Sequence, residues 1–311
     1  MNKHFKLDKS SKKTCVALGF FDGVHLGHNK IIKSVVSSKK DGLVPTVLTF
    51  SKSPCEYIEK LKEGKVAYLT TNETKEKIFE DLGVEQLYSL DFSSIKDMPA
   101  EQFVSKILVE TLNAEKVFCG FNYHFGSGGK SDATTLKNLC CEYGVQVITI
   151  EPVTYKDEVI SSTRIRKALT NGEIEEANAM LGRCFYYDFV ITKGNQIGRT
   201  IEAPTLNQPF PENFVLPKFG VYASAVKIEN AIYCGVTNIG VKPTIGKYNP
   251  LSETFVPQNN LVEMYGKQAK VMLIKFLRTE QKFDGIESLH KQIVKDSEKA
   301  KFFFNLIYRE I

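Results

Sequence analysis

The chain has 311 residues, of which 42% are hydrophobic and 25% charged, and its formal net charge is +5. This length indicates two domains, and the composition is that of an ordinary globular protein. The weak, dispersed positive charge suits small anionic ligands and argues against nucleic acid as a partner. The seven cysteines form no C-x-x-C pair, so we expect reduced thiols in a cytoplasmic protein. No signal peptide or membrane span is expected, because no apolar run approaches about 18 residues.

The first half of the chain alternates strand-like and helix-like segments five times. The expected strands are short apolar runs at 15–20, 45–50, 86–90, 116–119 and 145–150. The expected helices are amphipathic and follow His28, the capping-box pattern at 70–73 (TTNE), Pro99 and Asp132. Such alternation predicts a doubly wound parallel sheet. We expect residues 3–13 to be a solvated tail and one helical segment, 161–183, to close this half.

A glycine-bearing stretch with two histidines, 19–28 (GFFDGVHLGH), joins the first expected strand to the first helix. A helix N-terminus presents backbone N–H groups and a positive dipole end, which suit a phosphate, and imidazoles can add hydrogen bonds. Alone, the stretch would equally suit a turn with two exposed histidines. Polar stretches 51–54 and 120–131 also follow strands. Because open α/β sheets bind ligands outside the carboxyl ends of their strands, the three together favour a triphosphate site.

A second candidate anion site lies at 161–166 (SSTRIR), where hydroxyls stand at an expected helix start. Arg164 and Arg166 occupy the first turns, where arginine is disfavoured unless an anion compensates. Hydroxyl and guanidinium groups at a positive helix end suit a polyphosphate. The alternative is an ordinary capped helix with solvated arginines.

From about Phe185 the pattern changes to short β-branched and aromatic runs. They lie at 187–192, 220–228, 231–240 and 269–277, separated by Gly, Pro and Asn turns. This spacing predicts the antiparallel strands of a small barrel or sandwich. A long amphipathic helix, 285–309, ends the chain.

Taken in order, these motifs resemble the bacterial bifunctional riboflavin kinase/FMN adenylyltransferases (FAD synthetases). In the first half, 19–28 resembles the nucleotidyltransferase signature of that family. The stretch 120–126 (GFNYHFG) resembles its G-x-[DN]-[FY]-x-F-G loop, and 160–166 its S-S-T-x-I-R element. The resemblance implies a Rossmann-like nucleotidyltransferase domain over 1–183, which adenylylates FMN to FAD and releases pyrophosphate.

In the second half, 194–199 (GNQIGR) and 204–207 (PTLN) resemble the glycine loop and P-T-x-N motif of the kinase module. The stretch 238–244 (NIGVKPT) resembles its N-x-G-x-x-P-T segment. Alone, P-T-x-N would be read as an ordinary turn. The resemblance implies a small antiparallel β-barrel with a C-terminal helix over 184–311, which phosphorylates riboflavin with ATP.

The resemblance also implies roles for individual residues. His25 and His28 would be catalytic in adenylyl transfer, and Glu253 in the kinase reaction. Thr205 and Asn207 would be the metal ligands. The ATP-binding residues would be Gly19, Phe20, Phe21, Asp22, Gly23, His25, His28, Asn122, Ser162, Thr163, Arg166, Gly194, Gly198, Arg199, Thr205 and Asn207. The implied cofactor is Mg²⁺, with riboflavin, FMN and ATP as ligands, and neither nucleic acid nor membrane as a partner.

The chain departs from the family pattern at three places. Residues 49–54 read TFSKSP where T-F-x-P-H-P is usual, on the flavin side of the first site. Glu202 replaces a glycine, and Phe255 stands where a histidine is usual. Two alternatives therefore stay open, an FAD synthetase with a weak or inactive kinase domain and a non-catalytic flavin or nucleotide sensor. The sequence does not indicate the oligomeric state.

Overall fold

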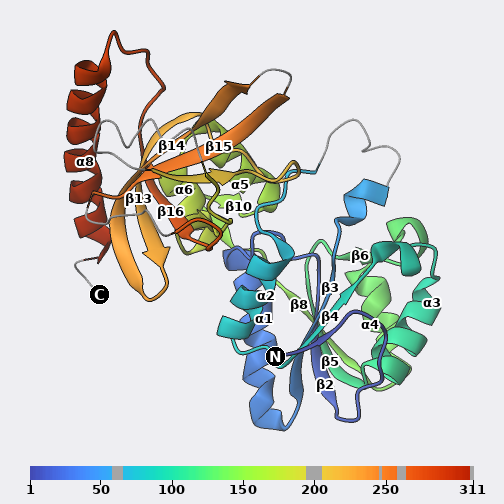
Figure 1. Cartoon of the computed structure of the whole chain (residues 1–311). Helices are drawn as coiled ribbons and strands as arrows, with labels where there is room; N and C mark the ends of the chain where they lie inside the picture. The colour runs from blue at the N-terminus through green and yellow to red at the C-terminus, as the bar shows by residue number, and fades with distance from the viewer. Residues whose placement is uncertain (58–65, 194–204, 245–246, 258–263, 309–311) are drawn as a thin grey trace. The chain divides into compact units, whose positions relative to one another are not determined.

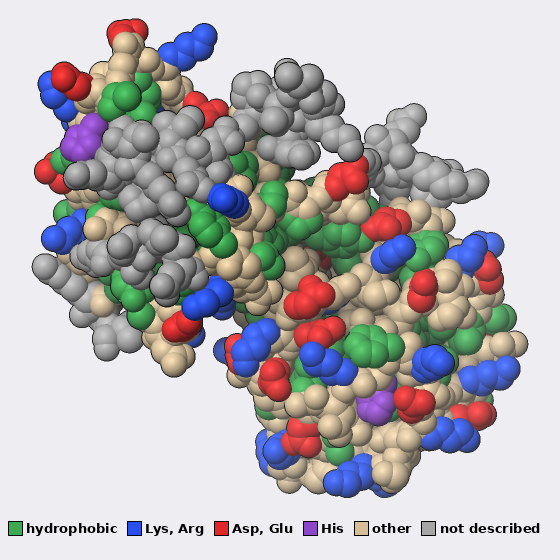
Figure 2. Space-filling view, in the orientation of Figure 1, with side chains coloured by type: hydrophobic (Ala, Val, Ile, Leu, Met, Phe, Trp, Pro, Cys, Tyr) green, Lys and Arg blue, Asp and Glu red, His purple; other side chains and the backbone are tan. Residues whose placement is uncertain are grey.

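The computed structural model describes residues 1–57, 66–193, 205–244, 247–257 and 264–308 (Figure 1). The chain divides into two compact units, Met1–Ser162 and Thr163–Ile311. The first unit has parallel strands between helices, and the second has an antiparallel sheet and a long terminal helix. Figure 2 shows lysine and arginine side chains interspersed with aspartate and glutamate over the visible face of the first unit. This distribution agrees with the dispersed charge of the sequence.

The first unit contains a six-stranded parallel sheet in the order β1-β4-β3-β2-β5-β8. Its strands are β1 Asn2–His4, β2 Thr14–Leu18, β3 Val44–Phe50, β4 Gln86–Leu90, β5 Ala114–Gly120 and β8 Gln146–Ile150. The five predicted strands are all present. The expectation of a solvated tail was wrong at its beginning, because β1 pairs with β4 as an edge strand. Three residues are too few to show a strand pattern by themselves.

Helices cover both faces of this sheet (Figure 1). They are α1 Leu26–Ser37, α2 Asn72–Asp81, α3 Ala100–Gln102, which continues as a π-helix Phe103–Thr111, and α4 Ala133–Cys141. The burial of β2 explains why both faces need helices, since every side chain of this strand is buried. Val16 and Leu18 lie in the core with Phe103 and Leu136, while Cys15 and Ala17 lie in the opposite core with α1 and α2. Alternate residues of a strand point to opposite faces, so the central strand needs a helical layer on each.

The predicted helices α2 and α4 are confirmed, although α2 begins at Asn72, one residue later than the capping-box pattern at 70–73 implies. Thr71 caps α2 by accepting a hydrogen bond from the Thr74 amide, and Asp132 caps α4 in the same way. The single helix expected over 161–183 is two helices, α5 Ser162–Asn171 and α6 Ile174–Leu181. They are separated at Gly172, whose φ of +82° is left-handed and ends the first helix.

The second unit is a curled six-stranded antiparallel sheet in the order β11-β16-β13-β14-β15-β12. Its strands are β11 Phe185–Tyr187, β12 Thr205–Pro209, β13 Gly220–Ile228, β14 Ala231–Thr244, β15 Lys247–Phe255 and β16 Lys270–Arg278. A bridge between Thr192 and Asn207 links the segment after β11 to β12 at the other edge of the sheet. The predicted antiparallel domain is confirmed, but β12 and β15 were not among the predicted strands.

The predicted terminal helix is confirmed as α8, Ile286–Tyr308. It packs through Ala300, Phe303 and Phe304 against β13, β14 and β16. Short pairs of strands complete the fold in the first unit: β6 His124–Phe125 with β7 Ser131–Asp132, and β9 Thr154–Tyr155 with β10 Glu158–Val159.

Candidate active sites

The loop between β2 and α1 lies at the switch point of the parallel sheet. The chain runs outward from β2 to β3 and β4 on one side, and to β5 and β8 on the other. In open α/β sheets the crevice at such a point, outside the carboxyl ends of the strands, is where ligands bind. The loops after β2 and β5 carry the stretches 19–28 and 120–126, so the fold places both motifs at this crevice.

The backbone of the loop after β2 adopts rare conformations. Phe21, Gly23 and Val24 have φ values of +57°, +77° and +38°. A positive φ is a pronounced outlier for a β-branched residue such as Val24. A Cβ on Gly19 would lie 2.9 Å from Cζ of Phe21, so glycine is required where the Phe21 ring folds back. Such strain persists only when the surroundings fix it, and it concentrates at ligand sites.

Asp22 fixes this loop. Its side chain is 3% exposed, and its carboxylate accepts hydrogen bonds from the amides of Leu69 at 3.0 Å and Thr70 at 3.3 Å. The Thr70 hydroxyl donates to the same carboxylate and accepts from the Gly23 amide at 3.2 Å. The buried charge is thus stabilised by hydrogen bonds, as burial requires. Asp22 holds the loop against the segment that leads into α2.

The two histidines of the signature stack at the N-terminus of α1. The ring centroids of His25 and His28 are 3.6 Å apart, with 19° between the planes. His25 caps the helix, because its Nδ1 accepts from the His28 amide at 3.4 Å. A neutral imidazole that accepts at Nδ1 carries its proton on Nε2. A Cβ on Gly27 would lie 3.1 Å from Cε1 of His25, so the glycine between the histidines leaves room for the ring.

The electrostatics of this helix end favour an anion. The first turn of α1 contains no acidic residue, so no side-chain carboxylate of that turn offsets the positive end of the helix dipole. Backbone N–H groups and two imidazoles are therefore gathered where a phosphate is stabilised. Of the two alternatives left open by the sequence, this geometry favours the phosphate site over a turn with exposed histidines, since His25 is only 6% exposed.

Two further predicted residues lie beside this loop. A Cβ on Gly120 would lie 3.3 Å from Oδ1 of Asn122 and 3.8 Å from Cδ1 of Ile31 in α1, so the end of β5 meets α1 at this point. The Ser162 hydroxyl donates to the Asp22 carbonyl at 2.9 Å, which ties the start of α5 to the loop. Thr163 and Arg166 continue along α5 but belong to the second compact unit.

A buried lysine at this edge was not identified from the sequence. Lys75, in the first turn of α2, is 3% exposed, and its Nζ donates to the carbonyls of Phe50 at 3.1 Å and Phe20 at 3.4 Å. Burial lowers its pKa to about 8, against the opposing effect of the Asp22 charge. The sequence held one signal, because Lys75 precedes the buried Phe79 by four residues and shares its stripe on the helix.

The segment after β3, which departs from the family pattern, contains an aromatic group. The ring of Phe92 lies 5.1 Å from that of Phe50 and 5.6 Å from that of Tyr57. The Tyr57 hydroxyl donates to Asp91 at 2.9 Å, and Tyr68 accepts from the Ser53 amide at 3.0 Å. Where the family has a proline and a histidine, this chain has Lys52 and Ser53, and the three rings of Phe50, Tyr57 and Phe92 pack beside this segment.

In the second unit, Glu253 stands in a row of polar residues. The strand register pairs it with Asn207 of β12 on one side and Asn238 of β14 on the other. Residues paired in this way point to the same face of a sheet. The adjacent Thr254 faces the other side, where its hydroxyl is 2.9 Å from that of Thr237. The fold thus gathers two amides around the Glu253 carboxylate.

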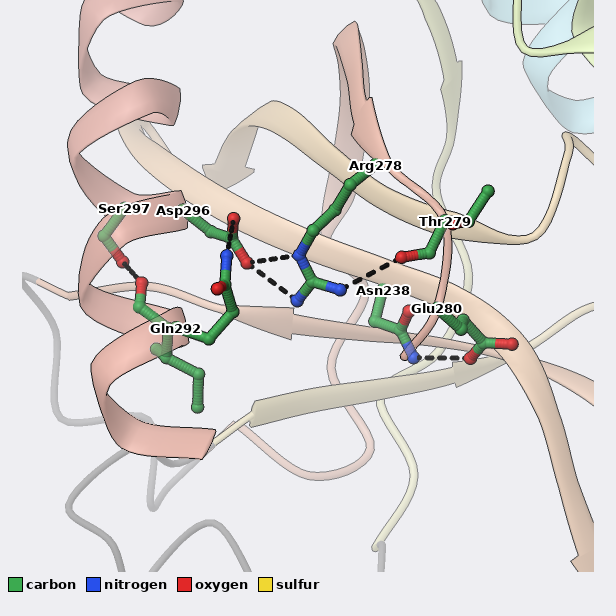
Figure 3. Close-up of polar contacts among 8 residues, drawn as sticks. Asn238, Arg278, Thr279, Glu280, Gln292, Asp296 and Ser297 are labelled. Carbon is green, nitrogen blue, oxygen red and sulfur yellow. Dashed lines mark hydrogen bonds and ion pairs between the residues drawn. The ribbon is translucent and has the colours of Figure 1, made fainter. Parts of the chain in front are cut away.

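Both amides leave an acceptor unused among the described residues. Asn207 donates to the Thr205 carbonyl at 3.1 Å, while its Oδ1 is buried and without a hydrogen-bond partner. Asn238 donates to Glu280 at 3.1 Å (Figure 3), and its Oδ1 is likewise buried and without a partner. A buried acceptor without a donor is costly, and in native proteins it calls for an explanation. Bound hydroxyl groups, water or a cation would satisfy both.

The remaining predicted kinase residues, Gly194, Gly198 and Arg199, lie outside the described residues, as does Glu202. Within the described part of the chain, no group of three or more His, Cys, Asp or Glu side chains gathers in a way that would hold a metal ion. Across the same residues, no helix is long and apolar enough to cross a membrane.

Sequence comparison divides the chain between two enzyme families. The FAD synthetase family matches residues 7–164, and the riboflavin kinase family matches residues 181–304. The first match ends near the structural division after Ser162, and the second begins near the predicted division at 183. The boundary at 183 stays a prediction.

Curated relatives match over nearly the whole chain. The bifunctional riboflavin kinase/FMN adenylyltransferase of Bacillus subtilis is 35% identical and covers 97% of this chain and 96% of its own. That of Escherichia coli K12 is 30% identical and covers 96% of both chains. A crystal structure described as a macrolide-efflux protein from Streptococcus pneumoniae superposes with a TM-score of 0.85 at 30% identity, over 96% of this chain and 98% of the other. The chain belongs to the bifunctional riboflavin kinase/FMN adenylyltransferase family, the transferases that make FMN and FAD from riboflavin and ATP.

Proposed function

We propose that the two reactions take place at two separate sites of this chain. FMN adenylylation is assigned to the carboxyl edge of the parallel sheet, and riboflavin phosphorylation to the row around Glu253. The observation that carries the first assignment is the stack of His25 and His28 at the N-terminus of α1, beside the switch point. The paired register of Asn207, Glu253 and Asn238 supports the second.

In the first reaction, a phosphate oxygen of FMN attacks the α-phosphorus of ATP. A new P–O bond forms, the bond from the α-phosphorus to the bridging oxygen breaks, and pyrophosphate leaves. No covalent enzyme intermediate is needed, so catalysis consists of alignment and stabilisation of the charge that spreads over the phosphates. His25 and His28 donate hydrogen bonds to these oxygens, and the α1 dipole favours the added charge.

The other predicted residues of this site would act around the triphosphate. Asn122 orients the nucleotide from the β5 side, and Ser162 binds the phosphates from the start of α5; the family resemblance gives Thr163 and Arg166 the same role. Because the Asp22 carboxylate is occupied by the amides of Leu69 and Thr70, Asp22 contributes through the backbone of its loop. Gly19, Phe20, Phe21 and Gly23 supply backbone groups in the same way.

In the second reaction, the 5′-hydroxyl of riboflavin attacks the γ-phosphorus of ATP. Glu253 accepts the hydroxyl proton, the bond from the γ-phosphorus to the bridging oxygen breaks, and ADP leaves. The Oδ1 of Asn207, which is buried and has no hydrogen-bond partner among the residues that the structure describes, and the Thr205 hydroxyl are neutral oxygens of the kind that Mg²⁺ prefers. These residues fit the ion, which would neutralise phosphate charge when bound. In the first site Mg²⁺ would be held mainly by the phosphates and water.

The test is a chromatographic assay of both conversions. Purified protein with ATP and Mg²⁺ is given FMN in one reaction and riboflavin in the other. His28→Ala is expected to abolish FAD formation from FMN and to leave riboflavin phosphorylation intact, and Glu253→Ala to do the opposite. His290→Ala and Glu287→Ala, both exposed on α8, are the matched controls.

The outcomes separate the alternatives that the sequence left open. An inactive kinase domain gives FAD from FMN but no FMN from riboflavin. A non-catalytic sensor gives neither product. Equal loss of both activities in either variant would contradict two independent sites.

A further inference from the structure

Lys75 is a buried ammonium whose contacts join two walls of the adenylylation site. Its Nζ donates to the carbonyl of Phe20, in the loop that leads to the histidines, and to that of Phe50, the last residue of β3. The ammonium also lies 4.5 Å from the centre of the Phe20 ring. One cation thus holds the loop after β2 and the start of the segment after β3 at a fixed separation.

These contacts are strong because water is excluded. Hydrogen bonds from an ionised donor are roughly twice as strong as neutral ones, and they strengthen further in a low-dielectric interior. An aromatic face adds a cation–π contribution to a desolvated ammonium. An apolar side chain of similar length would fill the space but would leave both carbonyls without this donor.

Lys75 and Asp22 together connect the loop after β2 to α2 and to the residues just before it. The carboxylate binds the amides of Leu69 and Thr70, immediately before the Thr71 cap of α2, and Lys75 lies one turn into that helix. The loop after β2 is therefore tied to α2 twice, once through each buried charge. Both charged residues are only 3% exposed.

We propose that Lys75 is a positioning residue for adenylyl transfer. It fixes the spacing between the histidine loop, which would hold the triphosphate, and the segment 51–57, which the family resemblance places on the flavin side. It acts through the two carbonyls and does not touch the reacting atoms. The proposal rests on the location of the adenylylation site given above.

The position requires a charged ammonium, so the proposal predicts a pH dependence. The pKa of Lys75 is lowered to about 8 by burial, so the cation is lost just above neutral pH. The charged groups that act on it are Asp22, from the loop after β2, and Glu76 on its own helix, and both favour the cation. FAD formation should therefore fall as the pH rises above 8, while the kinase reaction of the same chain does not follow that titration.

The experiment compares Lys75→Met, Lys75→Arg and the control Lys77→Met, whose side chain is exposed on the same helix. Steady-state kinetics of both reactions are measured from pH 6.5 to 9.5. Lys75→Met should lower kcat for FAD formation at least ten-fold at pH 7, with a smaller change in KM, and should remove the fall above pH 8. Lys75→Arg should keep more activity than the methionine variant at pH 9, since guanidinium does not titrate there. Lys77→Met should match the wild type.

Three results would overturn the proposal. They are a kcat for Lys75→Met within two-fold of wild type, an equal loss of both activities, and a wild-type fall above pH 8 in Lys75→Arg. If Lys75→Met does not fold, the pH profile of Lys75→Arg decides. The His28→Ala variant shows whether the Lys75 proposal or the location of the adenylylation site is wrong. If the site is located correctly, His28→Ala loses FAD formation whether or not Lys75 positions the loop.

Discussion

Replacing Asp296 by alanine should destabilise the second unit without harming FAD formation. Asp296 is 1% exposed, and its Oδ2 accepts from Nε of Arg278 at 2.9 Å and from Nη2 at 2.8 Å (Figure 3). Its Oδ1 accepts from Gln292 at 2.9 Å. This fork joins α8 to the end of β16.

The magnitude follows from what the substitution leaves behind. Breaking a buried ion pair by removing one partner costs about 3–5 kcal/mol. The Arg278 side chain is 21% exposed and can regain some water, so we expect the lower end, about 3 kcal/mol. For a unit of this size each kcal/mol lowers Tm by about 2–4 °C, which gives a fall of roughly 6–12 °C.

The kinase reaction should suffer as well as the stability. Arg278 also donates to the carbonyl of Thr279, the neighbour of Glu280, whose carboxylate accepts from Asn238 in the Glu253 row. Circular dichroism melting and the two-reaction assay are applied to Asp296→Ala and to Glu298→Ala, an exposed acid on the same helix. The reasoning is refuted if Asp296→Ala melts within about 2 °C of wild type, or if FAD formation at 25 °C falls together with the kinase reaction.

Two further predictions concern Gly240 in β14 and the buried Lys75. Gly240→Ala should lower riboflavin phosphorylation at least five-fold, because the new Cβ would lie 2.8 Å from Cδ of Glu280 and displace the carboxylate from Asn238; unchanged kinase kinetics would contradict this. The free energy of unfolding in urea should be measured for wild type and Lys75→Met at several pH values. The wild-type value minus the variant value should rise by roughly 3 kcal/mol between pH 8 and 10.5. The folded pKa of Lys75, about 8, is below the usual 10.5, so the unfolded chain binds more protons in this interval; a Lys75→Met difference that does not change with pH would exclude the effect.

The sequence predicted the parallel sheet because strands such as β2 and β3 are buried on both faces and therefore read as predominantly apolar runs. The same reasoning failed for β12 and β15, which carry the proposed kinase residues. Asn207 and Glu253 stand on a face that is not an apolar core, and Thr254 faces a buried cluster of hydroxyls, so neither strand shows apolar alternation. Strands that form a polar site lack the pattern that identifies ordinary strands.

The residues of the candidate sites also differ in how far the sequence could predict them. Motifs located His25, His28 and Asn122 because their local spacing is distinctive, and the fold brings their loops to one crevice. Lys75 could not be located in this way, since its partners, Phe20 and Phe50, are distant in the chain and are contacted through backbone atoms. Contacts to carbonyls leave no signature in the identity of the residues that supply them.

The alternation along β15 makes the proposed kinase site depend on the pairing of this strand with β12 and β14. Glu253 faces the site and Thr254 the hydroxyl cluster inside the sheet. A shift of one residue would turn the carboxylate into that buried cluster and carry the threonine to the site. Burying the charged Glu253 carboxylate there would cost free energy, and this cost destabilises the sheet whose register is shifted. A single-residue insertion or deletion at the β14–β15 connection should therefore be far more damaging than a substitution there, and the Glu253 carboxylate itself helps to select the correctly folded form.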